Sequence, residues 1–177
     1  MTRAKSILSL AIAGCLLAAC GDKTGSTATA PAGPATTGAA AQDGPLTVVL
    51  KSVRQVEGVG RPYSIEKASE GGTLVVLDYS VTNSSATPVA AWRMPVIKLV
   101  DGSGTAHDTD LGRTMSYQQQ DDVADRPSGD LSPGSTVEDA AVFNVPKAGF
   151  DPATWSARIG EQKVPLAGSI GKPVKAG

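Results

Sequence analysis

Few residues in this chain could carry chemistry. The 177 residues include two cysteines, three methionines and a single histidine, His107. Cys20 follows a short apolar run near the N-terminus, whereas Met94 and Met115 lie on either side of His107 in the sequence. A cysteine thiol is a nucleophile that can be acylated, and thioether and imidazole groups together suit Cu(I). The first chemistry would fix the protein to a membrane, and the second would make it a metal carrier.

Cys20 ends a segment with the layout of a secretory signal. Arg3 and Lys5 are followed by a nearly continuous apolar stretch over residues 7–19. A secretory signal has an apolar region of about 7–15 residues, whereas a transmembrane helix needs roughly 20. The final four residues, Leu17-Ala18-Ala19-Cys20, resemble a bacterial lipobox. The resemblance implies that residues 1–19 are a lipoprotein signal peptide and that Cys20 is the lipidated first residue of the mature protein.

Lipidation of Cys20 would confine the protein to a membrane surface. Two or three acyl chains hold a protein essentially permanently, because each buried methylene contributes about 0.8 kcal/mol. We therefore expect a lipid-anchored protein of the cell envelope. In Gram-negative sorting, an aspartate directly after the lipidated cysteine favours the inner membrane. Gly21 takes that place here, so the outer membrane is favoured over the inner one, on its periplasmic or its surface face.

Residues 20–44 predict a disordered linker. After Cys20 this segment is almost entirely Ala, Thr, Gly, Pro and Ser, with no Leu, Ile, Val or aromatic residue. Such a composition cannot bury enough apolar surface to offset the entropy of ordering. A flexible coil of this length reaches about 25–30 Å. A glycosylated or peptide-binding stalk is the alternative that the composition allows.

Residues 45–167 predict one β domain, and residues 168–177 a flexible tail. The clearest strand is Thr73–Asn83, where apolar and polar side chains alternate, so we expect one buried face and one wet face that carries Asp78. Only residues 115–124 suit a short helix. Further strands are indicated within residues 46–50, 96–100, 137–145, 155–159 and 163–166.

Many short strands without the spacing of βαβ units favour an all-β, antiparallel sandwich. Residues 73–85, 99–102, 131–134 and 142–146, in this order, resemble secreted and lipid-anchored bacterial domains of unknown function. These domains have a telokin-like, immunoglobulin-like sandwich and are related to mycobacterial immunoprotective extracellular antigen. The resemblance implies about seven or eight strands and no catalytic motif. The chain departs from this pattern in an insert-like region over residues 104–130.

The residue types argue against enzymatic and nucleic-acid functions. No Gly-x-Ser-x-Gly elbow or phosphate-binding loop is present, and the mature domain has no nucleophilic cysteine. Without Arg3 and Lys5, 14 basic residues stand against 17 acidic ones, with no basic cluster to neutralise phosphates. The aspartates of the middle loops lack the spacing of a calcium loop. We therefore expect no enzyme, no cofactor and no nucleic-acid partner.

A small-ligand or copper carrier is the alternative function. Met94, His107 and Met115 supply ligands that suit Cu(I), although the closely paired Met and His motifs of copper chaperones are missing. For zinc, one histidine without a thiol falls short of the usual three or four ligands.

Partner binding is the function that we expect instead. Trp92 and Trp155 are predicted to anchor the core or its boundary, and either becomes an interface candidate if it is exposed. The segment 115–126, with Tyr117 beside three glutamines, is the loop most suited to partner contact, because binding residues concentrate on loops. Trp92, Met115 and Tyr117 are therefore the candidate binding residues of a non-catalytic module with an envelope protein partner.

Overall fold

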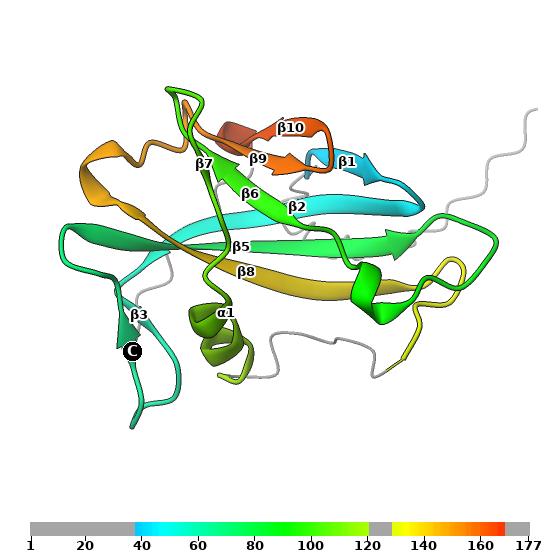
Figure 1. Cartoon of the computed structure of the whole chain (residues 1–177), viewed down its shortest axis with the longest axis horizontal. Coiled ribbons are helices and arrows are strands. Elements are labelled where there is room, and N and C mark those ends of the chain that lie inside the picture. Colours follow the sequence, from blue (N-terminus) through cyan, green and yellow to red (C-terminus); the bar gives the residue numbers. More distant parts are fainter. Residues whose placement is uncertain (1–37, 121–128, 169–177) are drawn as a thin grey trace, which may run out of the picture. The chain divides into compact units, whose positions relative to one another are not determined.

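The computed structural model describes residues 38–120 and 129–168, which form an antiparallel β-sandwich (Figure 1). One sheet, called sheet I, has the strand order β1-β2-β5-β8, and the second, sheet II, has the order β10-β9-β6-β7. A short β3–β4 hairpin and one α-helix complete the described part. The strands are β1 (Ala40–Asp43), β2 (Leu46–Val56), β3 (Gly58–Val59), β4 (Glu66–Lys67), β5 (Gly72–Asn83), β6 (Ile97–Val100), β7 (Ala106–His107), β8 (Thr136–Pro146), β9 (Ser156–Ile159) and β10 (Gln162–Pro165). The helices are α1 (Leu111–Gln118) and the 3₁₀ turns η1 (Ala91–Arg93), η2 (Lys147–Gly149) and η3 (Leu166–Gly168).

The predicted all-β, antiparallel sandwich is confirmed. Strands occupy all the segments in which alternation or apolar runs predicted them. The turn signals also act as expected: Gly134 and Gly160 adopt positive φ angles of 73° and 54°, which L-residues avoid. Asn83 ends β5 by accepting a hydrogen bond from the backbone N–H of Ser85 through its own side chain, at 2.9 Å.

The main core lies between the inner faces of the two sheets. Phe143 of β8, Leu99 of β6 and Ile159 of β9 are fully buried there, and Trp155 joins them with 3% of its surface exposed. Burial of each such side chain contributes about 1.5–3 kcal/mol. The contacts between these strands therefore make the sandwich possible without a disulfide.

The outer face of β5 is not wet, and this prediction was wrong. Leu74 and Val76 lie on that face and are fully buried in a second apolar cluster with Val59, Val142 and Tyr117. The cluster exists because α1 and the β3–β4 hairpin cover sheet I from outside. The alternating side chains of β5 therefore point into two different apolar clusters, and neither face of the strand is simply open to solvent.

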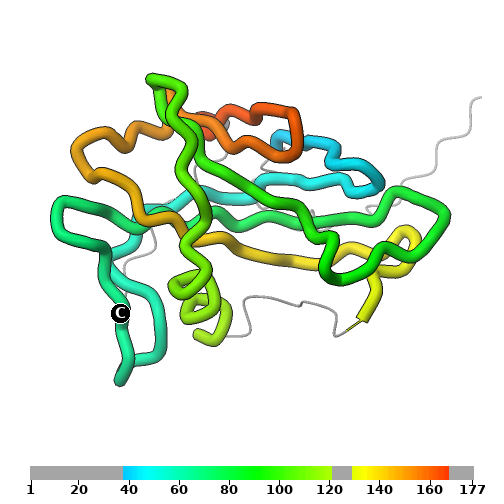
Figure 2. Tube along the Cα trace, viewed as in Figure 1, coloured from blue at the N-terminus to red at the C-terminus, as the bar shows by residue number. Residues whose placement is uncertain are grey.

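Helix α1 covers sheet I at the edge formed by β8 (Figure 2). It begins earlier than predicted, because the Asp110 side chain accepts a hydrogen bond from the Arg113 N–H and caps the first turn. The helix ends at Gln118, and residues 121–124 of the predicted helix lie outside the described residues. The insert-like region thus carries a helix that packs onto the sandwich.

The sandwich begins before residue 45, so the predicted linker is too long at its C-terminal end. Residues 40–43 form β1, which pairs with β2 and places Ala41 in the main core with 2% of its surface exposed. Small Ala residues are poor strand formers on their own, and pairing with the neighbouring strand overrides this preference. The signal peptide, Cys20, the rest of the linker and residues 169–177 lie outside the described residues.

Candidate functional site

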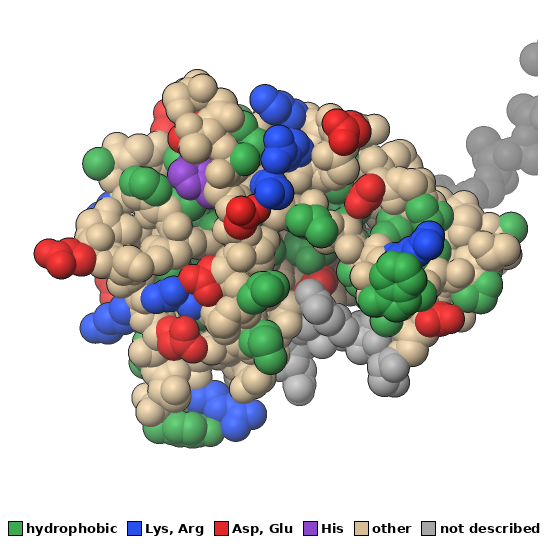
Figure 3. Space-filling view, in the orientation of Figure 1, with side chains coloured by type: hydrophobic (Ala, Val, Ile, Leu, Met, Phe, Trp, Pro, Cys, Tyr) green, Lys and Arg blue, Asp and Glu red, His purple; other side chains and the backbone are tan. Residues whose placement is uncertain are grey.

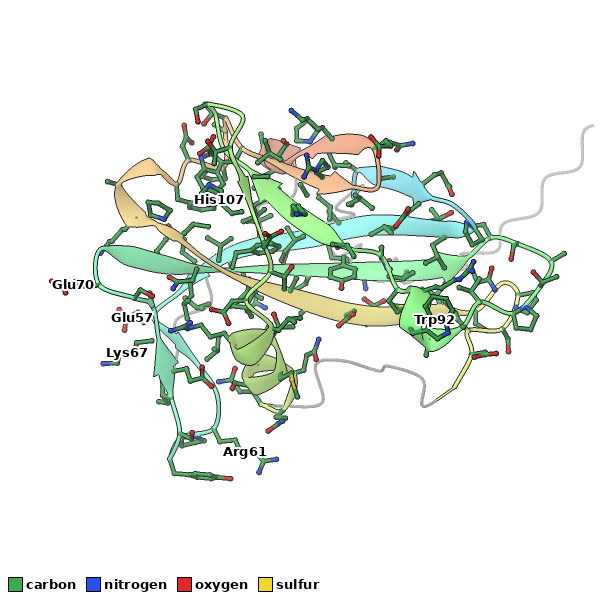
Figure 4. All side chains as sticks on the ribbon, viewed as in Figure 1. Glu57, Arg61, Lys67, Glu70, Trp92 and His107 are labelled. Atoms are coloured by element: carbon green, nitrogen blue, oxygen red, sulfur yellow. The ribbon has the colours of Figure 1, made fainter. Side chains whose placement is uncertain are left out.

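Trp92 is exposed, and the expectation that it anchors the core was wrong. Its side chain lies on η1 with 79% of its surface accessible, and η1 contains no buried residue (Figure 4). The guanidinium of Arg93 lies 4.9 Å from the Trp92 ring centre, so a cation–π contact holds the indole on the surface. Trp155, in contrast, is buried as predicted. An exposed indole remains a candidate for partner contact.

Tyr117 is buried, so it is not the exposed partner-binding residue that the sequence predicted. Its hydroxyl group contacts the Arg54 guanidinium and lies 3.4 Å from Asp78. Burial, together with the Asp78 carboxylate, raises the pKa of the Tyr117 hydroxyl. Helical periodicity turns Tyr117 towards β5, whereas Met115 is 60% exposed on the other side of α1.

Asp78 is also half-buried rather than solvent-facing. Arg54 forms an ion pair with it at 2.8 Å, and the Ser52 hydroxyl donates a further hydrogen bond. Burial opposes the charge of Arg54, but the neighbouring Asp78 carboxylate and the Tyr117 hydroxyl raise the pKa of its guanidinium. This network joins β2, β5 and α1, so its first role is structural.

The structure places Met94, His107 and Met115 in three different surroundings. Met94 packs against the main core, His107 stacks on Trp155 with ring centres 5.1 Å apart, and Met115 lies on the exposed side of α1. A Cu(I) site needs these groups on one ion, and no contact joins them in the described residues. Over residues 38–120 and 129–168, no three His, Cys, Asp or Glu side chains form a metal-binding group.

His107 lines an open hollow of about 280 Å³ beside the β6–β7 turn. Its Nε2 atom lies 3.3 Å from Oδ2 of Asp101, and the Ser103 hydroxyl donates to the same carboxylate at 2.7 Å. The Ser103 hydroxyl, followed by the Thr105 N–H and the His107 ring, lowers the pKa of Asp101 to about 2. Because Ser103 donates to the carboxylate and not to the imidazole, this arrangement does not activate a serine nucleophile. The cluster stabilises the turn.

Three basic side chains form a row across sheet II. In the strand register Lys98 of β6 lies opposite Arg158 of β9, which lies opposite Lys163 of β10. Neighbouring strands are about 4.8 Å apart, so the three backbones set the spacing of the row. Figure 3 shows Lys and Arg side chains gathered in a column over these strands, with acidic side chains on either side.

The row borders a cleft of about 420 Å³. Lys98 and Arg158 supply its basic lining, and Asp43 and Glu161 supply its acidic lining. Val96 and Met94 add apolar surface, and the Val96 side chain is 70% exposed. We call this site the bipolar cleft, defined by Asp43, Met94, Val96, Lys98, Arg158, Gly160 and Glu161.

Three chain segments build the bipolar cleft: the β1–β2 turn, residues 94–98, and residues 158–161 of β9 and the β9–β10 turn. The β1–β2 turn brings Asp43 against the β9–β10 turn, where its Oδ1 atom lies 3.0 Å from the position that a Cβ atom would take on Gly160. The backbone N–H of Gln42 also donates to Gln162 at 3.2 Å. These contacts close one end of the sandwich. Glycine at position 160 is needed both for its positive φ and for the close approach of Asp43.

Sequence reasoning missed the residues of the bipolar cleft except Met94. The available signal was the alternation of each predicted strand, which places a basic residue on its outer face. These residues are Lys98, Arg158 and Lys163. Their alignment depends on strand register, which the sequence does not reveal locally. Charges that look interspersed along the chain are therefore gathered on one face.

Comparison with known proteins identifies the domain class. Residues 35–151 match the family model described as a domain of unknown function, DUF4352. The uncharacterized protein YxkC of Bacillus subtilis (strain 168) is 33% identical over 113 residues, which are 63% of this chain and 63% of that protein. The chain thus spans less than two thirds of the length of this relative.

Two solved structures resemble this chain to different extents. A conserved hypothetical protein from Bacillus anthracis superposes with a TM-score of 0.64 at 21% identity, over 73% of this chain and 92% of that chain. An uncharacterized β-sandwich protein from Clostridium difficile gives a TM-score of 0.47 at 12% identity, over 72% of this chain and 87% of that chain. The first of these likenesses supports the fold alone.

The family match covers the region from just before β1 to the end of η2 and the first residues after it. It therefore includes α1, η1 and the β6–β7 hairpin. Four of the seven cleft residues fall within the match, whereas Arg158, Gly160 and Glu161 lie beyond it. The lipid anchor and the relationship to mycobacterial immunoprotective extracellular antigen stay predictions. Because the match extends over more than half of the sequence, the chain belongs to the DUF4352 family, whose domains have no known function.

Proposed function

We propose that this protein is a lipid-anchored interaction module of the cell envelope and that its β-sandwich is non-catalytic. The exposed Trp92 is the observation that carries the interaction role. An indole with 79% of its surface accessible contributes nothing to the main core, yet tryptophan is among the residues that contribute most to protein interfaces. Arg93, stacked on the ring, provides a second side chain of the type enriched in such contacts.

The anchor part of the proposal is supported by the residues before Cys20. Replacing the sulfur with oxygen in Cys20→Ser removes the atom that would carry the lipid. We expect the variant to leave the membrane fraction and to lose the mass of the lipid. The anchor would be contradicted if Cys20→Ser stayed in the membrane fraction and differed in mass from the wild type by no more than the exchange of sulfur for oxygen. Within the described residues, no helix has the length and apolar composition needed to cross a bilayer.

The interaction part is tested by mild cross-linking of intact membranes. We expect a discrete cross-linked species with the full-length protein, and its loss in Trp92→Ala. Tyr63→Ala is the matched control, because the Tyr63 side chain is equally exposed at 79% on the β3–β4 hairpin. A cross-linked species that persists in Trp92→Ala, or one that both variants remove equally, would argue against Trp92 as the contact.

Small-ligand binding is the second candidate function, and the bipolar cleft favours it. Its volume of about 420 Å³ falls within the range of small-molecule sites, roughly 300–1,000 Å³. The copper version of this function lacks such support, because Met94, His107 and Met115 have separate surroundings. Titration with Cu(I) under reducing conditions tests it directly, and we expect no binding tighter than micromolar.

A further inference from the structure

We infer that the bipolar cleft binds a small zwitterion, with the anionic group of the ligand on Lys98 and Arg158 and its ammonium group on Asp43 and Glu161. The inference deepens the small-ligand candidate function and does not depend on the lipid anchor. It assigns to the cleft a ligand class that contains both phosphoethanolamine compounds and amino acids or short peptides.

The first argument is that the basic row is under-neutralised. Like charges directly opposite each other on neighbouring strands destabilise a sheet. Among the described residues of the row, Lys98 alone has an ion-pair partner, Asp108, at 2.5 Å. This carboxylate is 77% exposed and also attracts Arg158, so it neutralises the row only in part. In the part of the chain that the structure describes, neither Arg158 nor Lys163 forms an ion pair. An anion beside Arg158 would relieve this repulsion.

Cations on sheet I show that the fold can neutralise its own charges. Lys51 pairs with Glu138 across strands at 2.6 Å, and Arg54 pairs with Asp78 at 2.8 Å. On sheet II the three cations of the row share one carboxylate, Asp108, which pairs with Lys98 and attracts Arg158. Among the described residues, no ion pair neutralises Lys163. The contrast indicates that the row of Lys98, Arg158 and Lys163 is not an ordinary solvated sheet face.

The second argument comes from the acidic side of the cleft. Asp43 and Glu161 line the same cleft as Lys98 and Arg158, but no ion pair joins the two groups in residues 38–120 and 129–168. Separated charges of opposite sign in one small cleft are complementary to a molecule that carries both signs. A polyanion would meet the two carboxylates and be repelled, so a nucleic acid or an acidic polymer is disfavoured.

The third argument is the apolar surface between the charged groups. Val96, with 70% of its side chain exposed, and the half-buried Met94 belong to the cleft lining. In phosphoethanolamine and in amino acids, short hydrocarbon segments connect the ammonium and the anionic group. Val96 and Met94 would contact these segments, as small-molecule sites commonly combine apolar walls with a few placed polar groups.

Isothermal titration of the full-length protein in a non-ionic detergent tests the inference. The probes are O-phosphoethanolamine, glycerophosphoethanolamine and glycylglycine, with inorganic phosphate and ethanolamine as single-charge controls. We expect at least one zwitterion to bind saturably, and at least about tenfold more tightly than either single-charge control. The phosphate-bearing and carboxylate-bearing probes distinguish the two sources of the zwitterion.

Variants assign the two ends of the ligand. Arg158→Gln removes the central cation, and Glu161→Gln removes the carboxylate of an exposed residue. We expect each variant to weaken zwitterion binding by about three- to tenfold, because each removes one partly solvated charge contact. Lys51→Gln is the matched control on sheet I, and its affinity should equal that of the wild type. Thermal unfolding of each variant verifies that it is folded.

Three results would overturn the inference. One is the absence of saturable binding by every zwitterion up to about 20 mM, which corresponds to negligible affinity. Another is phosphate binding as tight as zwitterion binding, which would indicate a simple anion site. The last is an unchanged affinity in both Arg158→Gln and Glu161→Gln. Membrane partitioning and the Trp92-dependent cross-link use other residues, so their failure is distinguishable from failure of the cleft.

Discussion

At the residue scale, Asp78 has a role that its position in an alternating strand does not suggest. Its carboxylate accepts hydrogen bonds from Ser52 and Arg54 of β2 and faces Tyr117 of α1. Arg54 and Asp78 retain only 21% and 22% of their side-chain surface. A half-buried ion pair with further hydrogen bonds is more sensitive to removal of one partner than an exposed pair.

We predict that Asp78→Ala lowers the free energy of unfolding by about 2–4 kcal/mol, because Arg54 would keep its burial but lose its counter-charge. The comparison variant is Glu138→Gln, which breaks the Lys51 pair, whose side chains are 49% and 45% exposed. That change should cost no more than about 1 kcal/mol. Urea unfolding measures both values. Equal losses in the two variants would show that the Asp78 network stabilises the fold no more than an exposed ion pair does.

Asp101 gives a prediction for acid stability. Its pKa is about 2 in the folded protein, below the ordinary value of 3.8, because Ser103, Thr105 and His107 bind the ionised form. A lowered folded pKa means that the unfolded chain takes up a proton first. The contribution of Asp101 is therefore present above about pH 4 and is lost as the pH falls towards 2.

We expect Asp101→Asn to unfold with a shallower pH dependence than the wild type between about pH 4 and pH 2, because the titrating carboxylate is gone. Chemical unfolding at a series of pH values measures this slope. Ser103→Ala, which removes the first donor, should reduce the slope in part. If the acid slope of Asp101→Asn matched that of the wild type, the carboxylate would not be linked to folding in this range.

At the scale of elements, α1 protects the edge of sheet I. Thr114 Oγ1 accepts a hydrogen bond from the Val142 N–H at 2.9 Å, and the Asp110 N–H donates to the Val142 carbonyl at 2.8 Å. The Gln118 side chain donates to the Ala140 carbonyl at 3.1 Å. These contacts satisfy outward backbone groups of β8, which would otherwise offer an edge to another chain. The helix thus closes the sheet and covers its second apolar cluster.

Thr114 makes this role testable, because its side chain is buried with 5% of its surface exposed. Thr114→Val keeps the shape but leaves the Val142 N–H without its acceptor. We predict a loss of about 1–3 kcal/mol in the free energy of unfolding. Hydrogen exchange of the Val142 amide should accelerate as well.

Thr114→Ser is the control for this change, since it keeps the hydroxyl group, and its Val142 amide should stay more protected than that of Thr114→Val. Exchange that is equally slow in the wild type, the Ser variant and the Val variant would mean that α1 does not hold this edge.

Contacts of α1 also extend to the β3–β4 hairpin. Arg113 donates to the Lys67 carbonyl at 2.7 Å, and Ser116 donates to Glu66 at 2.5 Å. The hairpin in turn supplies Val59 to the second apolar cluster. The insert-like region is therefore a structural cover where the structure describes it, and Met115 is its exposed member among the predicted binding residues.

At the scale of the whole molecule, the start of the domain decides how sheet I ends. Residues 40–43 pair with β2, and Asp43 then reaches the β9–β10 turn of sheet II. Removing this strand would leave β2 as a long unprotected edge. The same change would remove one carboxylate from the bipolar cleft.

We predict that a truncated chain beginning at residue 38 keeps the stability of the full-length protein, whereas one beginning at residue 45 loses about 1–3 kcal/mol. The loss follows from a few backbone hydrogen bonds, each contributing about 0.5–1.5 kcal/mol. The shorter chain should also aggregate more readily because of its open edge. Urea unfolding and light scattering measure the two effects. If both truncated chains were equally stable, residues 38–44 would not contribute to the stability of the domain, and its boundary would lie at residue 45.

The sequence predicted the strands of the sandwich well, because each depends on local information. Alternation in residues 73–83 and the turn residues Pro133, Gly134 and Gly160 act within a few positions of the chain. The environments of individual side chains were predicted less well. Trp92 was expected to be buried and is exposed, whereas Tyr117 was expected to be exposed and is buried. Exposure depends on which element packs above a residue.

The sequence by itself determined the antiparallel sandwich, because local periodicity and turn chemistry suffice to specify strands and their ends. It also contains the whole basis for the anchor prediction at Cys20. Only the tertiary structure decided that the outer face of β5 is covered and that Lys98, Arg158 and Lys163 form one row. The physical reason is that strand register and helix docking bring together residues distant in the chain, and no local pattern specifies these contacts.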